Sequence, residues 1–185
     1  CGEALRVEAK HICISKLIIQ SSYDRESTYT YENTGIHASH AHEITLCDLQ
    51  IYGFCTNLLL RDSDYASVLR CTFNQARIGG IEALQCRKLQ IQQCRFLANG
   101  WMKKDECKLS GFCNTGVALR LENTVDTQLI QCIFLQNARA LWAMHVHHLF
   151  GEDCIEENQV RCSLVYGDAS FAGGSGFDDE SIFIG

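Results

Sequence analysis

The stretch that decides the fold is LQIQQCRFLANG, which runs from Leu89 to Gly100. Apolar and polar residues alternate in it in two short bursts, and it contains no proline. A period of two is typical of half-buried β-strands rather than of a helix. The stretch TQLIQCIFLQNA, which begins at Thr127, carries cysteine, phenylalanine and asparagine at the same offsets. The sequence therefore predicts a repeated unit of short strands.

The repeat extends over most of the chain. Residues equivalent to Leu89 follow one another at steps of 32, 22, 23, 38 and 22 residues, so the two long steps carry insertions. These equivalent residues are Ile12, Ile44, Ala66, Leu89, Thr127 and Leu149. Each unit carries two apolar pairs, such as Leu89/Ile91 and Cys94/Phe96. A third pair precedes each of the later units, as Ile81 and Ala83 precede Leu89. Repeats of this length indicate a solenoid, because stacked turns bury the apolar face that a single turn leaves exposed.

Ladders of like residues are expected inside the stacked turns. Cysteine stands at one phase of four units and phenylalanine at another phase of three: Cys71, Cys94, Cys132 and Cys154, then Phe73, Phe96 and Phe134. Asn99 and Asn137 are expected where the chain turns out of the third strand. The shared phase favours cysteine as a small buried hydrophobe, because a disulfide scaffold would place its cysteines at turns. Free thiols in this number favour a reducing intracellular compartment, and a secreted or surface location stays open.

The repeat GIEALQCRKLQIQQCRFLANG, residues 80–100, resembles that of the right-handed parallel β-helix superfamily, the pectin-lyase-like fold. The resemblance covers Leu5 to about Tyr166. It implies an all-β, right-handed parallel β-helix of roughly six to seven turns, each of about 22 residues with three short strands. The superfamily includes polysaccharide lyases and hydrolases, phage tailspikes, bacterial surface passengers and intracellular adaptors. The resemblance therefore implies a fold without choosing a function.

We expect residues 1–185 to form a single β-helix domain that is a fragment of a longer chain. Family members usually cap the N-terminal end of the helix, and no amphipathic helix precedes Leu5. Missing sequence or an end-to-end contact with a partner is expected at this uncapped turn. Insertion loops are predicted at about 20–34 and 100–116, leaving from one edge of the solenoid. In the second loop, Cys107 and Cys113 are either a local disulfide or two free thiols.

In β-helix enzymes of this superfamily, the active site lies on the outer face of the first strand of each turn. The resemblance implies the same place here. Residues that alternate with the apolar pairs of that strand are expected to stack in one column: His37, Arg61, Glu82, Arg120, Glu122 and Trp142. An indole beside arginines and carboxylates is suited to binding a sugar chain, and Trp101 of the second loop joins this predicted ligand-binding set. The alternative is a solvated face with paired charges.

Glu82, Glu122 and Arg120 are the candidate catalytic residues. Glycoside hydrolysis uses two carboxyl groups about 5–9.5 Å apart, which glutamates on adjacent turns can provide. Arg120 could neutralise charge in a lyase, but the acidic calcium cluster of the pectate lyases has no visible counterpart. The sequence therefore favours a non-catalytic module that binds a glycan or a protein partner. A carbohydrate-active enzyme, either a polysaccharide lyase or a glycoside hydrolase, is the alternative.

No metal site and no cofactor are predicted. Histidines cluster in two stretches, HASHAH at residues 37–42 and HVHH at residues 145–148. In the second stretch, His145 and His147 share one face of a strand and could chelate one metal ion. The two clusters lie four turns apart, roughly 19 Å, so they cannot form one site, and turn histidines with ordinary hydrogen bonds are favoured. The stretch GGSGFDDES, residues 173–181, is similar to the calcium β-roll nonapeptide. It occurs once and carries Glu180 where an apolar residue is required, so calcium is the weaker interpretation.

The overall charge bears on the class of partner. The formal net charge is −6, which argues against nucleic acid or an anionic membrane surface as the main partner. No run approaches the 18 apolar residues of a membrane span. Protein and glycan partners are therefore the expected classes.

Overall fold

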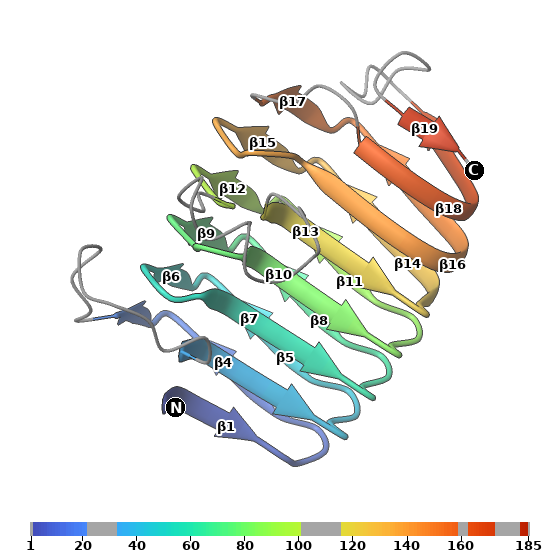
Figure 1. Cartoon of the computed structure of the whole chain (residues 1–185). Coiled ribbons are helices and arrows are strands. Elements are labelled where there is room, and N and C mark those ends of the chain that lie inside the picture. Colours follow the sequence, from blue (N-terminus) through green and yellow to red (C-terminus); the bar gives the residue numbers. More distant parts are fainter. Residues whose placement is uncertain (1, 22–32, 101–115, 159–162, 173–181, 185) are drawn as a thin grey trace, which may run out of the picture.

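The computed structural model describes residues 2–21, 33–100, 116–158, 163–172 and 182–184. Within these residues every regular element is a β-strand, and neighbouring strands pair in parallel. The strands form one sheet of 13 strands and one of six, and the sheets curl around a buried interior (Figure 1). The architecture is all-β with curled parallel sheets, which is compatible with a parallel β-helix or another β-solenoid.

The strands fall into three groups by direct pairing. The first group is β1 (Gly2–Val7), β4 (Asn33–Ser39), β7 (Thr56–Arg61), β10 (Gly79–Leu84), β13 (Val117–Glu122) and the first part of β16 (Leu141–Glu152). The second is β2 (Cys13–Ser15), β5 (Thr45–Cys47), β8 (Ser67–Leu69), β11 (Gln90–Gln92), β14 (Val125–Ile130) and the second part of β16. The third is β3 (Ile18–Gln20), β6 (Gln50–Tyr52), β9 (Thr72–Asn74), β12 (Arg95–Leu97), β15 (Ile133–Leu135) and β17 (Ile155–Glu157). β18 (Ser163–Ala172) pairs with β16, and β19 (Ile182–Ile184) pairs with β18.

The pairing register is the one that the sequence repeat predicts. Phe96 pairs with Phe73 on one side and with Phe134 on the other. The ring centroids are 5.4 Å and 4.6 Å apart, and all three side chains are fully buried. Ile91 likewise pairs with Val68 inside the second group. Register is fixed in this way because a shift of one residue would turn every apolar side chain outward.

The corners between the short strands rely on left-handed backbone conformations. Among the described residues, twenty that are not glycine have φ between 49° and 57°. Lys88, Gln93 and Ala98 are examples, and they bracket the short strands β11 and β12. A left-handed residue turns the chain sharply, which ends one strand and starts the next. The three-residue strands follow from this spacing of corners.

A ladder of asparagine side chains supports the turn after the third group. Asn99 and Asn137 are fully buried, as expected for residues that leave the third strand. The Asn137 side-chain amide donates to the carbonyl of Phe96 at 2.9 Å. Its side-chain oxygen accepts from the Asn99 backbone N–H at 2.9 Å, and Asn158 accepts from the Asn137 backbone in the same manner. Each rung satisfies backbone groups of the neighbouring rung that would otherwise be buried without a partner.

The repeat cysteines form the buried ladder that the sequence predicts. Cys71, Cys94, Cys132 and Cys154 are free thiols and are fully buried. Each thiol lies within hydrogen-bonding distance of two backbone carbonyls, the one two residues before it and one in the preceding repeat. For Cys94 these acceptors are Gln92 and Val68, both at 3.4 Å. A small apolar side chain with a weak donor therefore fits each of these corners.

Cys86 occupies a different corner and carries a pH prediction. Burial raises the pKa of its thiol to about 11. Below the ordinary thiol pKa of about 8.5, the Cys86 thiol is protonated in both the folded and the unfolded chain. In that pH range its ionisation therefore takes nothing from the free energy of unfolding. As pH rises towards 11, only the unfolded chain ionises, and about 2–3 kcal/mol of stability should be lost.

Urea unfolding of the parent chain and of Cys86→Ala at pH 7.5 and pH 10.5 measures this loss. The parent chain should lose more stability than the variant between the two pH values. Equal losses would show that the alkaline destabilisation arises from other groups and not from Cys86.

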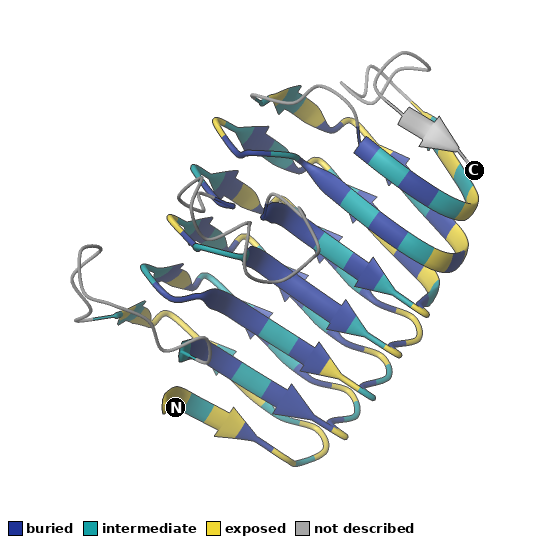
Figure 2. Ribbon diagram, viewed as in Figure 1, coloured by how far each residue is buried: buried dark blue, intermediate teal, exposed yellow. Residues whose placement is uncertain are grey.

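The N-terminal edge of the stack leaves apolar residues exposed. Leu17 and Ile18 have relative exposures of 45% and 66%, and Figure 2 shows β1 and β3 largely exposed or half-buried. Ile155 on β17 is 56% exposed at the opposite edge. The predicted end-to-end contact at the N-terminal turn stays a prediction. Most of the two predicted insertions, residues 22–32 and 101–115, lies outside the described residues, and so do Trp101, Cys107 and Cys113.

Candidate functional site: an arginine–tryptophan stack on the first strands

The predicted column divides into two rows on the outer face of the first group of strands. Direct pairing places His37, Leu59, Glu82, Arg120 and Trp142 in one row. The second row holds Ser39, Arg61, Leu84, Glu122 and Met144. The expectation of a single column is therefore wrong for Arg61 and Glu122, which lie two residues further along their strands. The reason is the pleat of the strand: residues i and i+2 face the same side of the sheet, but they lie at different positions along the strand and so belong to different rows.

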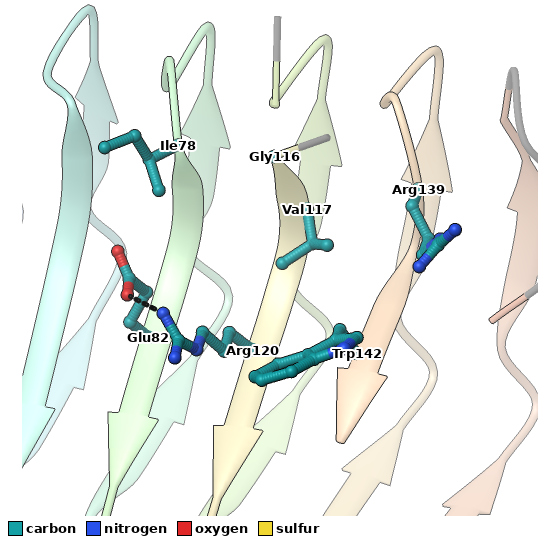
Figure 3. A pocket seen from close by; sticks show the side chains of 7 residues that line it. All are labelled: Ile78, Glu82, Gly116, Val117, Arg120, Arg139 and Trp142. Carbon is teal, nitrogen blue, oxygen red and sulfur yellow. Dashed lines mark hydrogen bonds and ion pairs between the residues drawn. The ribbon is translucent and has the colours of Figure 1, made fainter. Parts of the chain in front are cut away.

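Arg120 is the centre of the residues that the structure brings together. Its guanidinium donates to Glu122 at 2.8 Å and to Glu82 at 3.4 Å. Its central carbon lies 4.7 Å from the centroid of the Trp142 ring, a cation–π contact. Figure 3 shows the side chain extended between Glu82 and Trp142. Two carboxylates and one indole thus fix a single half-buried guanidinium.

Glu82 is held in place by residues that the sequence analysis did not identify. Its carboxylate accepts a hydrogen bond from the Thr56 hydroxyl of the neighbouring strand β7, and only 9% of the residue is exposed. Its side chain lies over Gly79, where an added Cβ would come within 2.9 Å of the Glu82 Cγ. Gly79 therefore provides the room in which Glu82 lies against the sheet. In the sequence, the glycine two residues before the apolar pair Ile81 and Ala83 is the signal that could have indicated room for the Glu82 side chain.

A small hollow adjoins this stack. Its volume is about 40 Å³, and it is lined by Ile78, Glu82, Gly116, Val117, Arg120, Arg139 and Trp142 (Figure 3). The side-chain Nε atoms of Arg120 and Arg139 are buried and have no hydrogen-bond partner. Gly100 and Gly116, the ends of the second insertion, meet beside it, because a Cβ on Gly116 would lie 2.5 Å from the Gly100 Cα. The second insertion therefore leaves the sheet at the hollow.

The remaining predicted residues of the column lie away from this cluster. His37 pairs through its Nδ1 atom with Glu3 on β1, and its other ring nitrogen is buried without a hydrogen-bond partner. Leu59 separates His37 from Glu82 in the row. Arg61 is exposed at the end of β7. His37 and Arg61 therefore do not join Arg120 and Trp142 in one compact site.

Two histidines of the stretch 145–148 contact nearby aspartates. His147 and His148 contact Asp168, and His148 also contacts Asp126 at 2.9 Å. The backbone N–H of His148 holds the pKa of Asp168 below its ordinary value. Among the described residues, no group of three or more metal-binding side chains is assembled. The calcium-like stretch 173–181 lies outside the described residues.

A wider hollow lies on the second group of strands near the N-terminal edge. It measures about 380 Å³ and its lining includes His11, Cys13, Glu43 and Tyr65. His11 bonds to Glu43 at 2.7 Å. The structure shows no hydrogen bond between the Cys13 thiol and His11, both of which are described residues, so the contact that would activate a nucleophilic cysteine is not formed.

No protein-family model matches the chain, and no curated protein or solved structure is significantly similar to it. The described residues contain no apolar helix of the length that a membrane span requires. The site is therefore interpreted from its own geometry.

Proposed function

We propose that this chain is a non-catalytic binding module that presents the outer face of its first strands to a protein or glycan partner. The observation that carries the proposal is the Arg120–Trp142 stack. A guanidinium over an indole, fixed by Glu82 and Glu122, offers a flat surface with both apolar and charged character. Arginine and tryptophan are the residues that most often dominate binding energy at such surfaces.

The proposal rests on a rigid support. We propose that the curled sheets form a right-handed parallel β-helix of six to seven turns with three short strands each. The pairing partners support this arrangement, since Phe73 and Phe96 are one repeat apart and pair directly. The inward neighbours of Arg120, namely Leu119 and Leu121, are fully buried in the core. The stack is thus attached to a packed sheet, which reduces the conformational entropy that binding would cost.

A carbohydrate-active enzyme is the second candidate function. The observation in its favour is that Glu82 and Glu122 contact the same guanidinium and so lie close together. Two features favour the binding module instead. Both carboxylates are engaged with Arg120, whereas a glycosidase needs one as a proton donor and the other as a free base or nucleophile. A hollow of about 40 Å³ also has no room to enclose a sugar ring.

Trp142→Ala tests the binding face. We expect it to cost about 1–3 kcal/mol of affinity, because the buried ring contact with the ligand is lost. The measurement is a screen of the intact protein against a glycan array and candidate protein partners, followed by titration of each hit. Phe150→Ala is the matched control, since Phe150 is a half-buried aromatic on the same strand β16 but in the second group. Hits that respond equally to both variants, or to neither, would contradict the assignment.

A further inference from the structure

Arg139 carries a charge that the described residues do not balance. It precedes β16 and lines the hollow together with Trp142. Its buried Nε has no hydrogen-bond partner, and it forms no ion pair with the described residues. Arg120, by contrast, is compensated by two carboxylates. In a chain of net charge −6, a half-buried guanidinium with no ion pair among the described residues is unexpected, because burying an unpaired charge is costly.

The size of the hollow selects a small group. Its volume of about 40 Å³ compares with roughly 10–15 Å³ for one water molecule on the same measure. A carboxylate of three heavy atoms fits such a space, whereas a pyranose ring does not. A carboxylate also matches the planar donor geometry of a guanidinium. The occupant indicated by size and charge is therefore a single carboxylate.

The surroundings indicate a protein as the source of that carboxylate. Partly exposed apolar and aromatic side chains occupy the rows around Arg120 and Trp142: Leu59, Leu84, Met144, Leu164 and Tyr166. Aromatic residues, methionine and arginine are enriched at protein interfaces, and lysine and acidic residues are depleted there. A sugar chain would instead need free hydrogen-bonding groups beside the ring, and those of Glu82, Arg120 and Glu122 are already engaged with one another.

We infer that the hollow accepts an aspartate or glutamate side chain of a protein partner, whose carboxylate binds the Arg139 guanidinium beside Trp142. This inference rests on the proposed binding function and names the partner's chemistry at that face. Trp142 packs against the methylene groups of the incoming side chain. Arg139 is the anchor, because its buried Nε has no hydrogen-bond partner and it has no ion pair among the described residues, whereas Arg120 is shared between Glu82 and Glu122.

Tryptophan fluorescence tests this inference on the intact chain. The chain has two tryptophans, so Trp101→Phe makes Trp142 the sole reporter. Because Trp101 belongs to the predicted ligand-binding set, calorimetric titration of the parent chain with the same peptides checks that this substitution does not itself change binding. The probes are a tetraglutamate peptide, the neutral tetraglutamine peptide and polygalacturonate. We expect a saturable change with tetraglutamate and none with tetraglutamine. Arg139→Gln should weaken tetraglutamate binding about ten-fold or more, because a charge-assisted hydrogen bond is lost.

Two further variants control for folding and for net charge. Arg139→Lys keeps the charge and should retain part of the affinity, which separates loss of the anchor from loss of the fold. Arg95→Gln removes an exposed arginine of β12 and should leave binding unchanged. Unaltered tetraglutamate binding in Arg139→Gln would overturn the inference, and so would a fluorescence change that never saturates.

The probes also separate this inference from the proposed function. An Arg139-dependent response to polygalacturonate alone would keep the binding face and overturn the protein-derived carboxylate. A response to none of the probes would overturn the inference. The binding function would then be judged by the Trp142→Ala screen.

Discussion

Phe96→Asp is expected to abolish the cooperative fold. Phe96 is fully buried between Phe73 and Phe134, whose rings stack on it from both sides. Truncating such a side chain costs about 3–5 kcal/mol, and the buried carboxylate adds a further desolvation cost. The total stability of a domain is about 5–15 kcal/mol, so little or none would be left. Far-UV circular dichroism during urea unfolding should show no cooperative transition.

The matched control is the residue that precedes Phe96 on the same strand. Arg95 is exposed on the outer side of β12, so Arg95→Glu should unfold at a urea concentration close to that of the parent chain. Gln90→Glu and Ile91→Asp form a second pair on β11, with the same contrast between an outward and an inward position. Equal tolerance within either pair would show that the inward and outward faces are wrongly assigned.

Asn137→Ala is expected to cost about 3 kcal/mol or more. Its side chain donates to Phe96, accepts from the backbone and the side chain of Asn99, and is fully buried. Removing it leaves a buried carbonyl and a buried N–H without partners, at about 1–3 kcal/mol for each. The free energy of unfolding in urea measures the loss.

Asn74→Ala provides the control for Asn137→Ala. Asn74 is half-buried on β9 and follows the inward Phe73, so its side chain faces outward. Its replacement should change stability by no more than about 0.5 kcal/mol, as for most surface substitutions. A similar small change for Asn137→Ala would contradict the asparagine ladder.

The strand register could be predicted from the sequence because one kind of signal dominates it. Cysteine and phenylalanine recur at fixed offsets from Leu89, and in stacked parallel strands equal offsets place like residues on adjacent rungs. The inward side of each strand had to be apolar, and a shift by one residue would have exposed it. Asn99 and Asn137 carried a second signal, since their shared offset placed both at one turn.

The corners and part of the site could not be predicted in this way. Lys88 and Gln93 adopt left-handed conformations, although glycine and asparagine are the residues that usually indicate them. The rows of the site depend on how far along its strand each residue lies, so Arg61 was placed in the wrong row. Arg139 stands outside the apolar pairs and gave no periodic signal. Its place in the proposed site depends on two structural observations, the hollow and a buried Nε that has no hydrogen-bond partner among the described residues.

The central claim is that the face around Arg120 and Trp142 binds a partner and does not catalyse. The measurement that tests it most directly is turnover of polyuronates by the intact protein and by the double variant Glu82→Gln/Glu122→Gln. The affinity of both proteins for the ligands found in the binding screen is measured in parallel. We expect no turnover above background in either protein, and modest weakening of binding in the variant because Arg120 loses both carboxylate partners. Turnover by the parent chain that falls by orders of magnitude in the variant, with affinity retained, would contradict the account and identify an enzyme.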